Sequence, residues 1–407
     1  MIKQIHASQL AVGMFIHELN CQSQHHPFAP RFKLTSDEEV EHVRAACLSP
    51  VYIDTAKGLD VPDAPTLQEA MAALEDELNT LAAGQCMLPI RATFAEEMLR
   101  AKTIKEQAQR KVSDMMHDVR LGKMIRLDDI ETEVEGITDS ILRNPGALTA
   151  LSQIRNKDDY TFLHSVSVGA LLVSFCVSAG MDQETIRQAG LGGLLHDAGK
   201  ACVPDEVLNK PGKLTKEEFI VMQNHPAYGF ELLSAIPGIG PIPLDIAHHH
   251  HERFNGDGYP DRIAGDKIDR LTQMAAIVDV YDSVTSSRAY HPGMSPAAAL
   301  RMLLEWGKSH FDPKLVQDFM RCVGFYPNGT LVLLESGRLG VVVEQHESNL
   351  MTPKVKVFYD TRKSSPLPVQ VVDLGAPLGA GGGDRIVSHE SAERWKVEPG
   401  MFLGDGG

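Results

Sequence analysis

The sequence lacks a long uninterrupted apolar run. Its longest apolar stretch, residues 166–180, is shorter than the roughly 20 residues that a helix needs to cross a bilayer. The amino terminus also lacks the basic region, apolar stretch and small-residue cleavage site of a signal peptide. We therefore expect a cytoplasmic protein with no membrane partner, in which residues 166–180 form a buried core helix.

Cysteine spacing typical of metal or redox motifs is missing as well. The chain has six cysteines, and none of them stands in a C-x-x-C pair. Cys176 and Cys202 lie in apolar sequence, which is typical of buried thiols. This usage favours a reducing cytosol.

Positive charge is scarce. The chain has 39 basic residues against 54 acidic ones, and its formal net charge is -15. Nucleic acids and anionic membranes would repel such a surface, so we do not expect DNA as a partner. An anionic substrate must instead be attracted locally, by metal cations together with Lys200 and Arg288.

A chain of 407 residues exceeds a typical single core, so more than one domain is expected. The expected fold class is mainly α. Residues 1–65 alternate short strand-like segments with one helix, which predicts a small N-terminal α/β module. Residues 66–121 read as a helical linker, residues 122–326 as the main helical domain, and residues 327–407 as a small barrel-like β module with a Gly-rich tail.

The linker helix expected over about residues 93–121 carries apolar side chains at helical spacing. These residues are Met98, Ile104, Ala108, Val112, Met115 and Val119. They can pack within the chain or between two protomers, and the pattern favours neither arrangement. A homodimer is therefore one of two equal expectations.

Residues of the types that bind metals cluster in the main helical domain. His196 is followed by Asp197, and His250 and His251 are adjacent. An adjacent His-Asp pair lets one carboxylate bridge two ions while the imidazole binds one of them. Three further candidates lie on apolar segments, where an unpaired imidazole or carboxylate is costly: His164, His225 and Asp279. One shared metal centre would satisfy all of these side chains.

Five segments carry a specific resemblance: YTFLHS, LLHDAGK, NHP, HHERFNGDGYP and DVYDSVTSSRAY. In these segments, over roughly residues 125 to 325, the chain resembles the HD-GYP family of bacterial cyclic di-GMP phosphodiesterases. The resemblance implies a helical catalytic domain, a central metal cluster and hydrolysis of a cyclic dinucleotide.

The resemblance also implies roles for the candidate ligands. We place His164, His196, Asp197 and Asp279 around a first divalent ion, and Asp197, His225, His250 and His251 around a second. Asp197 is then the bridge, and a hydroxide held between the two ions is the expected nucleophile. The mixed ligand set fits Fe, Mn, Ni or Zn. If one helix carries both residues, Lys200 lies one turn beyond His196, where it would stabilise charge or assist the leaving group.

Substrate contacts follow from the same resemblance. Arg288 matches the phosphate-binding arginine of the family, while His291 stands where a second cation is common, so that contact is expected to depend on pH. Tyr259 lies in the GYP loop, which in the family recognises substrate and contacts diguanylate cyclase (GGDEF) domains; a rigid structural turn is the equal alternative. Tyr160 replaces the glutamate of members with three metals, so we expect two ions.

The expected reaction is hydrolysis of cyclic di-GMP to pGpG, with further cleavage to GMP left open. Two alternatives remain: a phosphodiesterase for another cyclic dinucleotide, and a cyclic dinucleotide sensor or signalling scaffold with little turnover. His248 and His249 precede the ligand pair but fall outside the family motif. We expect them to be structural or to orient the ligands.

Overall fold

The computed structural model describes most of the chain. The described residues are 1–21, 31–70, 91–153, 160–210, 212, 214–286, 293–294, 296–307, 309–346, 349, 351–377, 382–390 and 392–403. The chain divides into two compact units, of which the first comprises Met1–Leu81 with Leu304–Lys308 and the second Ala82–Leu303 with Ser309–Gly407. The expected fold class is confirmed: a mainly helical protein with small sheet regions at both ends.

The first unit is a small α/β module. Its antiparallel sheet has the order β1-β4-β2-β3, formed by β1 (Ile2–Ile5), β4 (Cys47–Asp54), β2 (Phe15–Cys21) and β3 (Phe32–Lys33), and α1 spans Asp37–Ala46. Side chains of β1 alternate between half-buried and buried, because successive residues of a strand point to opposite faces. The buried face packs with Leu34, Val40 and Val43 into one core.

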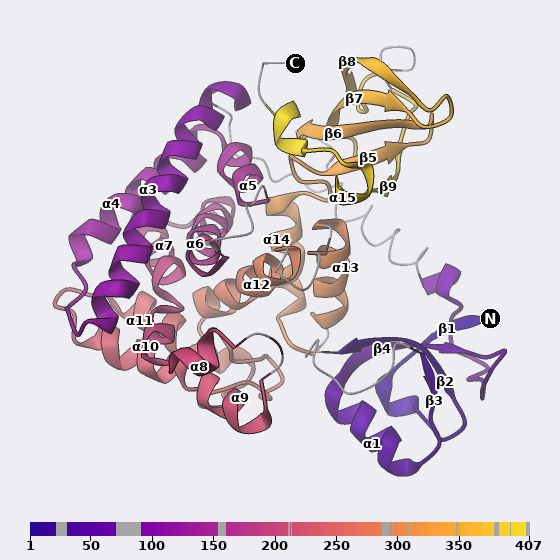
Figure 1. The fold of residues 1–407 in the computed structure, drawn as a ribbon, viewed down its shortest axis with the longest axis horizontal. Coiled ribbons are helices and arrows are strands. Elements are labelled where there is room, and N and C mark those ends of the chain that lie inside the picture. Colours follow the sequence, from indigo (N-terminus) through magenta and orange to yellow (C-terminus); the bar gives the residue numbers. More distant parts are fainter. Residues whose placement is uncertain are drawn as a thin grey trace. The chain divides into compact units, whose positions relative to one another are not determined.

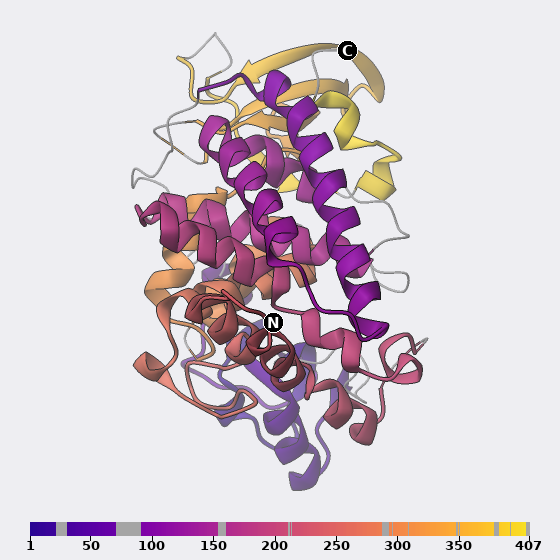
Figure 2. The same cartoon turned by 90° about the vertical axis from the view of Figure 1, so that its left-hand side faces the viewer.

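The second unit is built around α6 (Tyr160–Ser178), in which every residue from 163 to 176 is buried. Residues 166–180 thus belong largely to a buried core helix, as expected. No helix of the described residues combines the length and apolarity needed to cross a membrane. Figures 1 and 2 show the other helices of this part of the chain. They are α3 (Phe94–Arg120), α4 (Leu127–Arg143), α5 (Pro145–Gln153), α7 (Gln183–Leu195), α8 (Asp205–Leu208), α9 (Lys216–Met222), α10 (His225–Ser234), α11 (Pro241–His249), α12 (Arg270–Thr285), α13 (Pro296–Trp306) and α14 (Pro313–Val323).

The helix α3 begins with a capping box, in which Thr93 and Glu96 satisfy each other's backbone amides. It lies beside α4, as both views show (Figures 1 and 2). Its apolar face is used inside the chain: Ala108 and Val112 are buried, and Met98 packs against the C-terminal sheet. The apolar pattern of this helix is therefore accounted for by packing within the chain.

An ion pair with a buried carboxylate links α3 to α4. Glu97 has a fully buried side chain and accepts two hydrogen bonds from Arg143, at 2.8 and 2.9 Å, and one from Ser140 at 2.8 Å. Burial alone would raise the pKa of Glu97, but these hydrogen bonds lower it below its ordinary value. The pair's contribution to stability is therefore complete above the ordinary carboxyl range and declines as the pH falls through the lowered pKa.

Replacing Glu97 by glutamine should destabilise the second unit by about 1–3 kcal/mol, because the amide nitrogen that replaces one carboxylate oxygen cannot accept a hydrogen bond at this buried position. Urea unfolding followed by circular dichroism measures the change. Glu106→Gln, an exposed substitution on the same helix, should stay within about 0.5 kcal/mol of the wild type. Equal stabilities of the two variants would contradict the expectation.

The C-terminal part forms a five-stranded antiparallel sheet with the order β8-β7-β6-β5-β9. The strands are β5 (Leu331–Leu334), β6 (Arg338–Glu344), β7 (Lys354–Asp360), β8 (Ser365–Asp373) and β9 (Ile386–His389). Among the described strands, β8 and β9 are edges that do not pair with each other. The barrel-like closure suggested by the sequence is therefore wrong: strand alternation gives a sheet, but it does not determine whether the edges meet.

Candidate metal centre

The helices α6 and α12 bring the first two candidate ligands together. His164 lies on the buried α6, and its Nε2 is 2.9 Å from Oδ1 of Asp279 on α12. Both helices are apolar on nearly every side, so the two polar groups face each other in the interior of the helical unit. The pair needs mutual satisfaction or a shared cation, because each group has left water.

The adjacent residues His196 and Asp197 follow the end of α7. His196 is its C-terminal cap, and its Nδ1 is 2.8 Å from the carbonyl oxygen of Gly193, which leaves Nε2 to face the centre. Nε2 of His196 lies 3.3 Å from Oδ2 of Asp197 and 3.9 Å from Oδ1 of Asp279. The end of this helix thus contributes two buried ligand groups to one point.

One α-helix does not carry both His196 and Lys200, so the condition for placing Lys200 one turn beyond His196 is not met. The helix α7 ends at Leu195, and residues Ala198–Cys202 form the 3-10 helix η2. With three residues per turn, a 3-10 helix aligns residues i and i+3. Lys200 therefore stands over Asp197, with Nζ 2.6 Å from Oδ2. At the end of the same turn Cys202 is exposed, not buried as its apolar neighbours suggested.

A glycine makes the close approach of η2 to α10 possible. A Cβ on Gly199 would overlap the carbonyl oxygen of His225 and the amide nitrogen of Gly229. Both atoms belong to backbone, so they cannot rotate away as a side chain does. The absence of a side chain at Gly199 therefore lets the turn with Asp197 and Lys200 lie close to His225.

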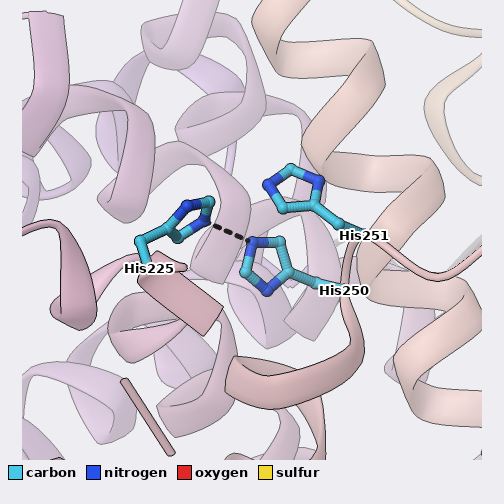
Figure 3. Close-up of side chains that lie close together, drawn as sticks. All are labelled: His225, His250 and His251. Atoms are coloured by element: carbon cyan, nitrogen blue, oxygen red, sulfur yellow. Dashed lines mark hydrogen bonds between the residues drawn. The ribbon is translucent and has the colours of Figure 1, made fainter. Parts of the chain in front are cut away.

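Three histidines from two segments form the other half of the centre (Figure 3). His225 begins α10, and its Nδ1 is held by the carbonyl oxygen of Met222 at 2.8 Å. His250 caps α11, and its Nε2 lies 3.3 Å from Nε2 of His225. One ring nitrogen from each of His225, His250 and His251 lies within 4.8 Å of the others, close enough for one ion to bind all three.

Asp197 lies between the two halves. Its Oδ2 is 3.8 Å from Nε2 of His164, while its Oδ1 is 3.4 Å from Nε2 of His225 and 3.9 Å from Nε2 of His250. Oδ1 of Asp197 and Nε2 of His196 are buried and have no hydrogen-bond partner within the part of the chain that the structure describes. Buried polar atoms without partners are rare and costly. Here the donor chemistry and the two orphaned atoms fit divalent transition metals.

The electrostatics of the centre differ between its carboxylate side and its histidine side. Burial raises the pKa of Asp197, but His196 and Lys200 outweigh it and hold that pKa well below its ordinary value. Burial lowers the pKa of His164, yet hydrogen bonds to Asp279 and Asp282 raise it to about 10. Burial and the neighbouring imidazoles lower the pKa of His250 to about 3. His250 therefore stays neutral with a lone pair for a metal, while Asp197 stays charged.

Asp282 is a residue of this site that the sequence reasoning missed. It is 2% exposed, and its Oδ2 accepts a hydrogen bond of 2.7 Å from Nδ1 of His164. A carboxylate at this place fixes the ring and directs Nε2 into the centre. The sequence did carry one signal for this role. Asp282 follows Asp279 by three residues on one helix, and residues at this spacing share a face.

Changing Asp282 to asparagine should weaken metal binding about 10- to 100-fold, because the ligand His164 loses a charged partner that orients it. Competition with a fluorescent chelator measures the affinity. Asp266→Asn, an exposed substitution outside the centre, serves as the control and should bind metal as the wild type does. An unchanged affinity in Asp282→Asn would show that the contact does not support the ligand.

Hydrogen bonds link the GYP loop to the segment that carries His250 and His251. Oε1 of the buried Glu252 accepts the backbone amides of Asp261 and Arg262, at 2.7 and 2.8 Å. A Cβ on Gly258 would lie 2.5 Å from Cα of Glu252, so the loop packs directly on this backbone. Glu252 is a second residue whose role the sequence reasoning did not identify.

This arrangement sets Tyr259 beside the ligands. Its ring centre is 4.8 Å from that of His251, at an interplanar angle of 31°. Burial and the carboxylates of Asp279 and Asp197 raise the pKa of Tyr259 above its ordinary value, so its hydroxyl stays protonated. Tyr259 can thus donate a hydrogen bond at the edge of the centre.

Some expected site residues lie outside the described part of the chain. Arg288 and His291 fall in residues 287–292, and the side chain of Tyr160 is likewise outside the description. The ligand set that the structure brings together is His164, His196, Asp197, His225, His250, His251 and Asp279.

Comparisons with known proteins agree with this geometry. A family model described as an HD domain matches residues 140–315, and a second, described as a domain of unknown function (DUF3391), matches residues 2–130. The first match includes every described ligand of the centre. The second extends past the expected module boundary at residue 65 and past α3.

Three curated relatives show where the similarity lies. A cyclic di-GMP phosphodiesterase of Pseudomonas aeruginosa is 42% identical over 97% of this chain and 94% of that protein. A cyclic di-GMP phosphodiesterase response regulator of Xanthomonas campestris is 38% identical over 42% of this chain and 44% of that protein. A 3′3′-cGAMP-specific phosphodiesterase of Vibrio cholerae is 39% identical over 30% of this chain and 24% of that protein.

Proposed function

Because the chain belongs to the HD-GYP family of cyclic di-GMP phosphodiesterases, we propose that it hydrolyses cyclic di-GMP to pGpG, with further cleavage to GMP left open. The observation that carries this proposal is the position of Asp197 between two groups of buried ligands. A carboxylate shared by two metal sites is the arrangement that phosphoester hydrolysis uses.

We assign two divalent ions to the centre. His164, His196, Asp197 and Asp279 would hold one, and Asp197 with the three remaining histidines would hold the other. When bound, the ions supply an activated water and neutralise charge on the phosphate oxygens. Fe, Mn, Ni and Zn all suit these ligands. Three metal ions seen within the centre in a crystal structure of the metal-loaded protein would contradict the assignment.

The protein's own side chains then act on the substrate. We propose that Lys200, whose side chain is 23% exposed beside Asp197, stabilises negative charge on the phosphate or on the departing ribose oxygen. Tyr259 is proposed to donate its hydroxyl proton in a hydrogen bond to the substrate. In this proposal Asp197 binds the metals and Lys200 stabilises the charge. Asp197 caps the 3-10 helix that contains Lys200.

A product assay tests the reaction. Full-length protein, purified anaerobically and loaded with Mn(II) or Fe(II), is incubated with cyclic di-GMP, and the products are separated by chromatography. The proposal expects pGpG, and a later appearance of GMP would show that cleavage continues. Tight binding without cleavage would instead support the alternative of a cyclic dinucleotide sensor or scaffold.

A second substrate is supported by one comparison. The similarity to a 3′3′-cGAMP-specific phosphodiesterase favours a test with that cyclic dinucleotide under the same conditions. Comparing kcat/KM for the two compounds ranks them. A higher value for 3′3′-cGAMP would reassign the substrate and leave the metal chemistry unchanged.

Arg288→Ala should raise KM for cyclic di-GMP about tenfold or more while metal content is retained, because a guanidinium can bind a phosphate through two hydrogen bonds. Steady-state kinetics and elemental analysis of the same preparation measure both quantities. Arg288→Lys keeps the charge but loses the planar fork, so it should fall between the other two proteins. Metal loss in Arg288→Ala would show that the residue supports the centre instead of the substrate.

Three broader expectations stay proposals. The loop side chains of Asp257, Asp261 and Arg262 are exposed, which supports contact with a diguanylate cyclase (GGDEF) domain, testable by titration with a purified domain.

A homodimer would use a surface other than the buried face of α3, and sedimentation velocity measures it. The cytoplasm remains the expected compartment because the cysteines are scattered, and fractionation of cells tests it.

A further inference from the structure

The outer end of α11 carries a second group of metal-binding side chains. One ligand atom from each of His248, His249 and Asp261 lies within 4.8 Å of the others. The two histidines directly precede the ligands His250 and His251, but consecutive residues of a helix point about 100° apart. His248 and His249 therefore form a group separate from the central ligands.

The ring of His249 is oriented by a carboxylate. Its Nδ1 is 2.8 Å from Oδ1 of Asp245, one turn earlier on α11, and Oδ2 of that residue accepts a hydrogen bond of 2.5 Å from the buried Thr272. Nε2 of His249 is thereby directed at Oδ2 of Asp261, 3.0 Å away. A histidine whose other nitrogen is held by a carboxylate is the arrangement common at protein metal sites.

His248 completes the group from the other side. Its ring stacks on Phe230 with centres 4.7 Å apart and planes at 26°, and its centre is 4.4 Å from that of His249. The aromatic contact restrains the plane of this ring, and one ring nitrogen lies within 4.8 Å of the other two ligand atoms. Asp261 is 53% exposed, which leaves its carboxylate room to adjust to an ion.

An ion has access to this place. A surface hollow of about 490 Å³ is lined by Phe230, Asp245, His248 and His249, among others. Two imidazoles and one carboxylate are ligands that suit Zn(II) and similar transition metals, with one coordination position left for water.

We propose that His248, His249 and Asp261 bind a divalent transition metal ion of the zinc class, separate from the catalytic centre. Asp245 orients His249 without binding the ion. Because Asp261 follows Tyr259 and Pro260 in the GYP loop, the ion joins this loop to α11, the helix that His250 caps. The site therefore steadies the loop that borders the catalytic centre.

The alternative is a simple ion pair, in which a protonated His249 bridges Asp245 and Asp261. Metal counting separates the two. Full-length wild type, His248→Asn and Asp261→Asn are dialysed against buffered Zn(II), and the ions per chain are measured by elemental analysis. The matched control is Asp257→Asn, an exposed substitution in the same loop. Circular dichroism checks that each variant is folded.

The proposal expects one ion fewer per chain in His248→Asn and in Asp261→Asn than in the wild type and in Asp257→Asn. Equal counts in all four proteins would overturn it. Hydrogen exchange gives a second measure: Zn(II) should slow exchange in residues 253–262 of the wild type and not of His248→Asn. The same slowing in both proteins would also count against the site. Neither measurement uses turnover, so the outcome is independent of the proposed substrate.

Discussion

Replacing Asp197 by alanine is expected to abolish phosphodiesterase activity and to lower the metal content of the protein in the same preparation. Oδ1 and Oδ2 of this residue face different groups of ligands, so its loss weakens both sites. Activation by two metals contributes several kcal/mol, and about 4 kcal/mol corresponds to a rate loss of about 10³-fold. Turnover of cyclic di-GMP and elemental analysis measure the two effects.

The matched control for this variant is Asp205→Ala. Asp205 lies eight positions along the chain, has a side chain that is 67% exposed and pairs with Arg120 at the surface. It should keep both activity and metal, because exposed ion pairs contribute little. Full turnover in Asp197→Ala, or full metal content with no turnover, would show that the carboxylate does not bridge the two sites.

The second large effect is expected from Gly199→Ala, the addition of a single methyl group. The new Cβ would overlap backbone atoms of His225 and Gly229, so η2 and α10 must separate. Overpacking of this kind destabilises by about 1–3 kcal/mol. It also moves Asp197 and Lys200 away from His225, so turnover should fall by about 10²-fold or more, since small misplacements at a reacting centre have effects of this size.

Gly136→Ala on α4 provides the comparison. A Cβ there comes no closer than 3.8 Å to any neighbour, and alanine favours helix, so this variant should be as stable as the wild type or slightly more stable. Thermal unfolding and turnover are measured for both glycine variants. Similar behaviour of the two would mean that the contact at Gly199 is not needed for the geometry of the centre.

The ligand positions could be predicted from the sequence because each residue carries its own signal. His164 and Asp279 are polar residues on segments that are otherwise apolar, and such residues need a partner inside the protein. The structure brings them within 2.9 Å, although their positions in the chain are far apart. That they bind metal remains a prediction, since the geometry supports it without testing it.

Other features depend on tertiary contacts and gave no sequence signal strong enough to use. The helical pattern did not reveal that α7 stops at Leu195, because the following 3-10 turn has a similar composition and differs in its hydrogen bonding. The need for glycine at position 199 exists only because α10 packs there. The hydrogen bonds of Glu252 to Asp261 and Arg262 likewise depend on the path of the loop.

The ends of three helices meet at the catalytic centre, with an electrostatic consequence. His196 and His250 cap the carboxyl ends of α7 and α11, whereas His225 begins α10. A helix macrodipole places about half a negative charge at its carboxyl end and half a positive charge at its amino end. The backbone thus adds net negative potential to that of Asp197 and Asp279. The bound ions, together with Lys200 and Arg288, must outweigh this potential before an anionic substrate is attracted.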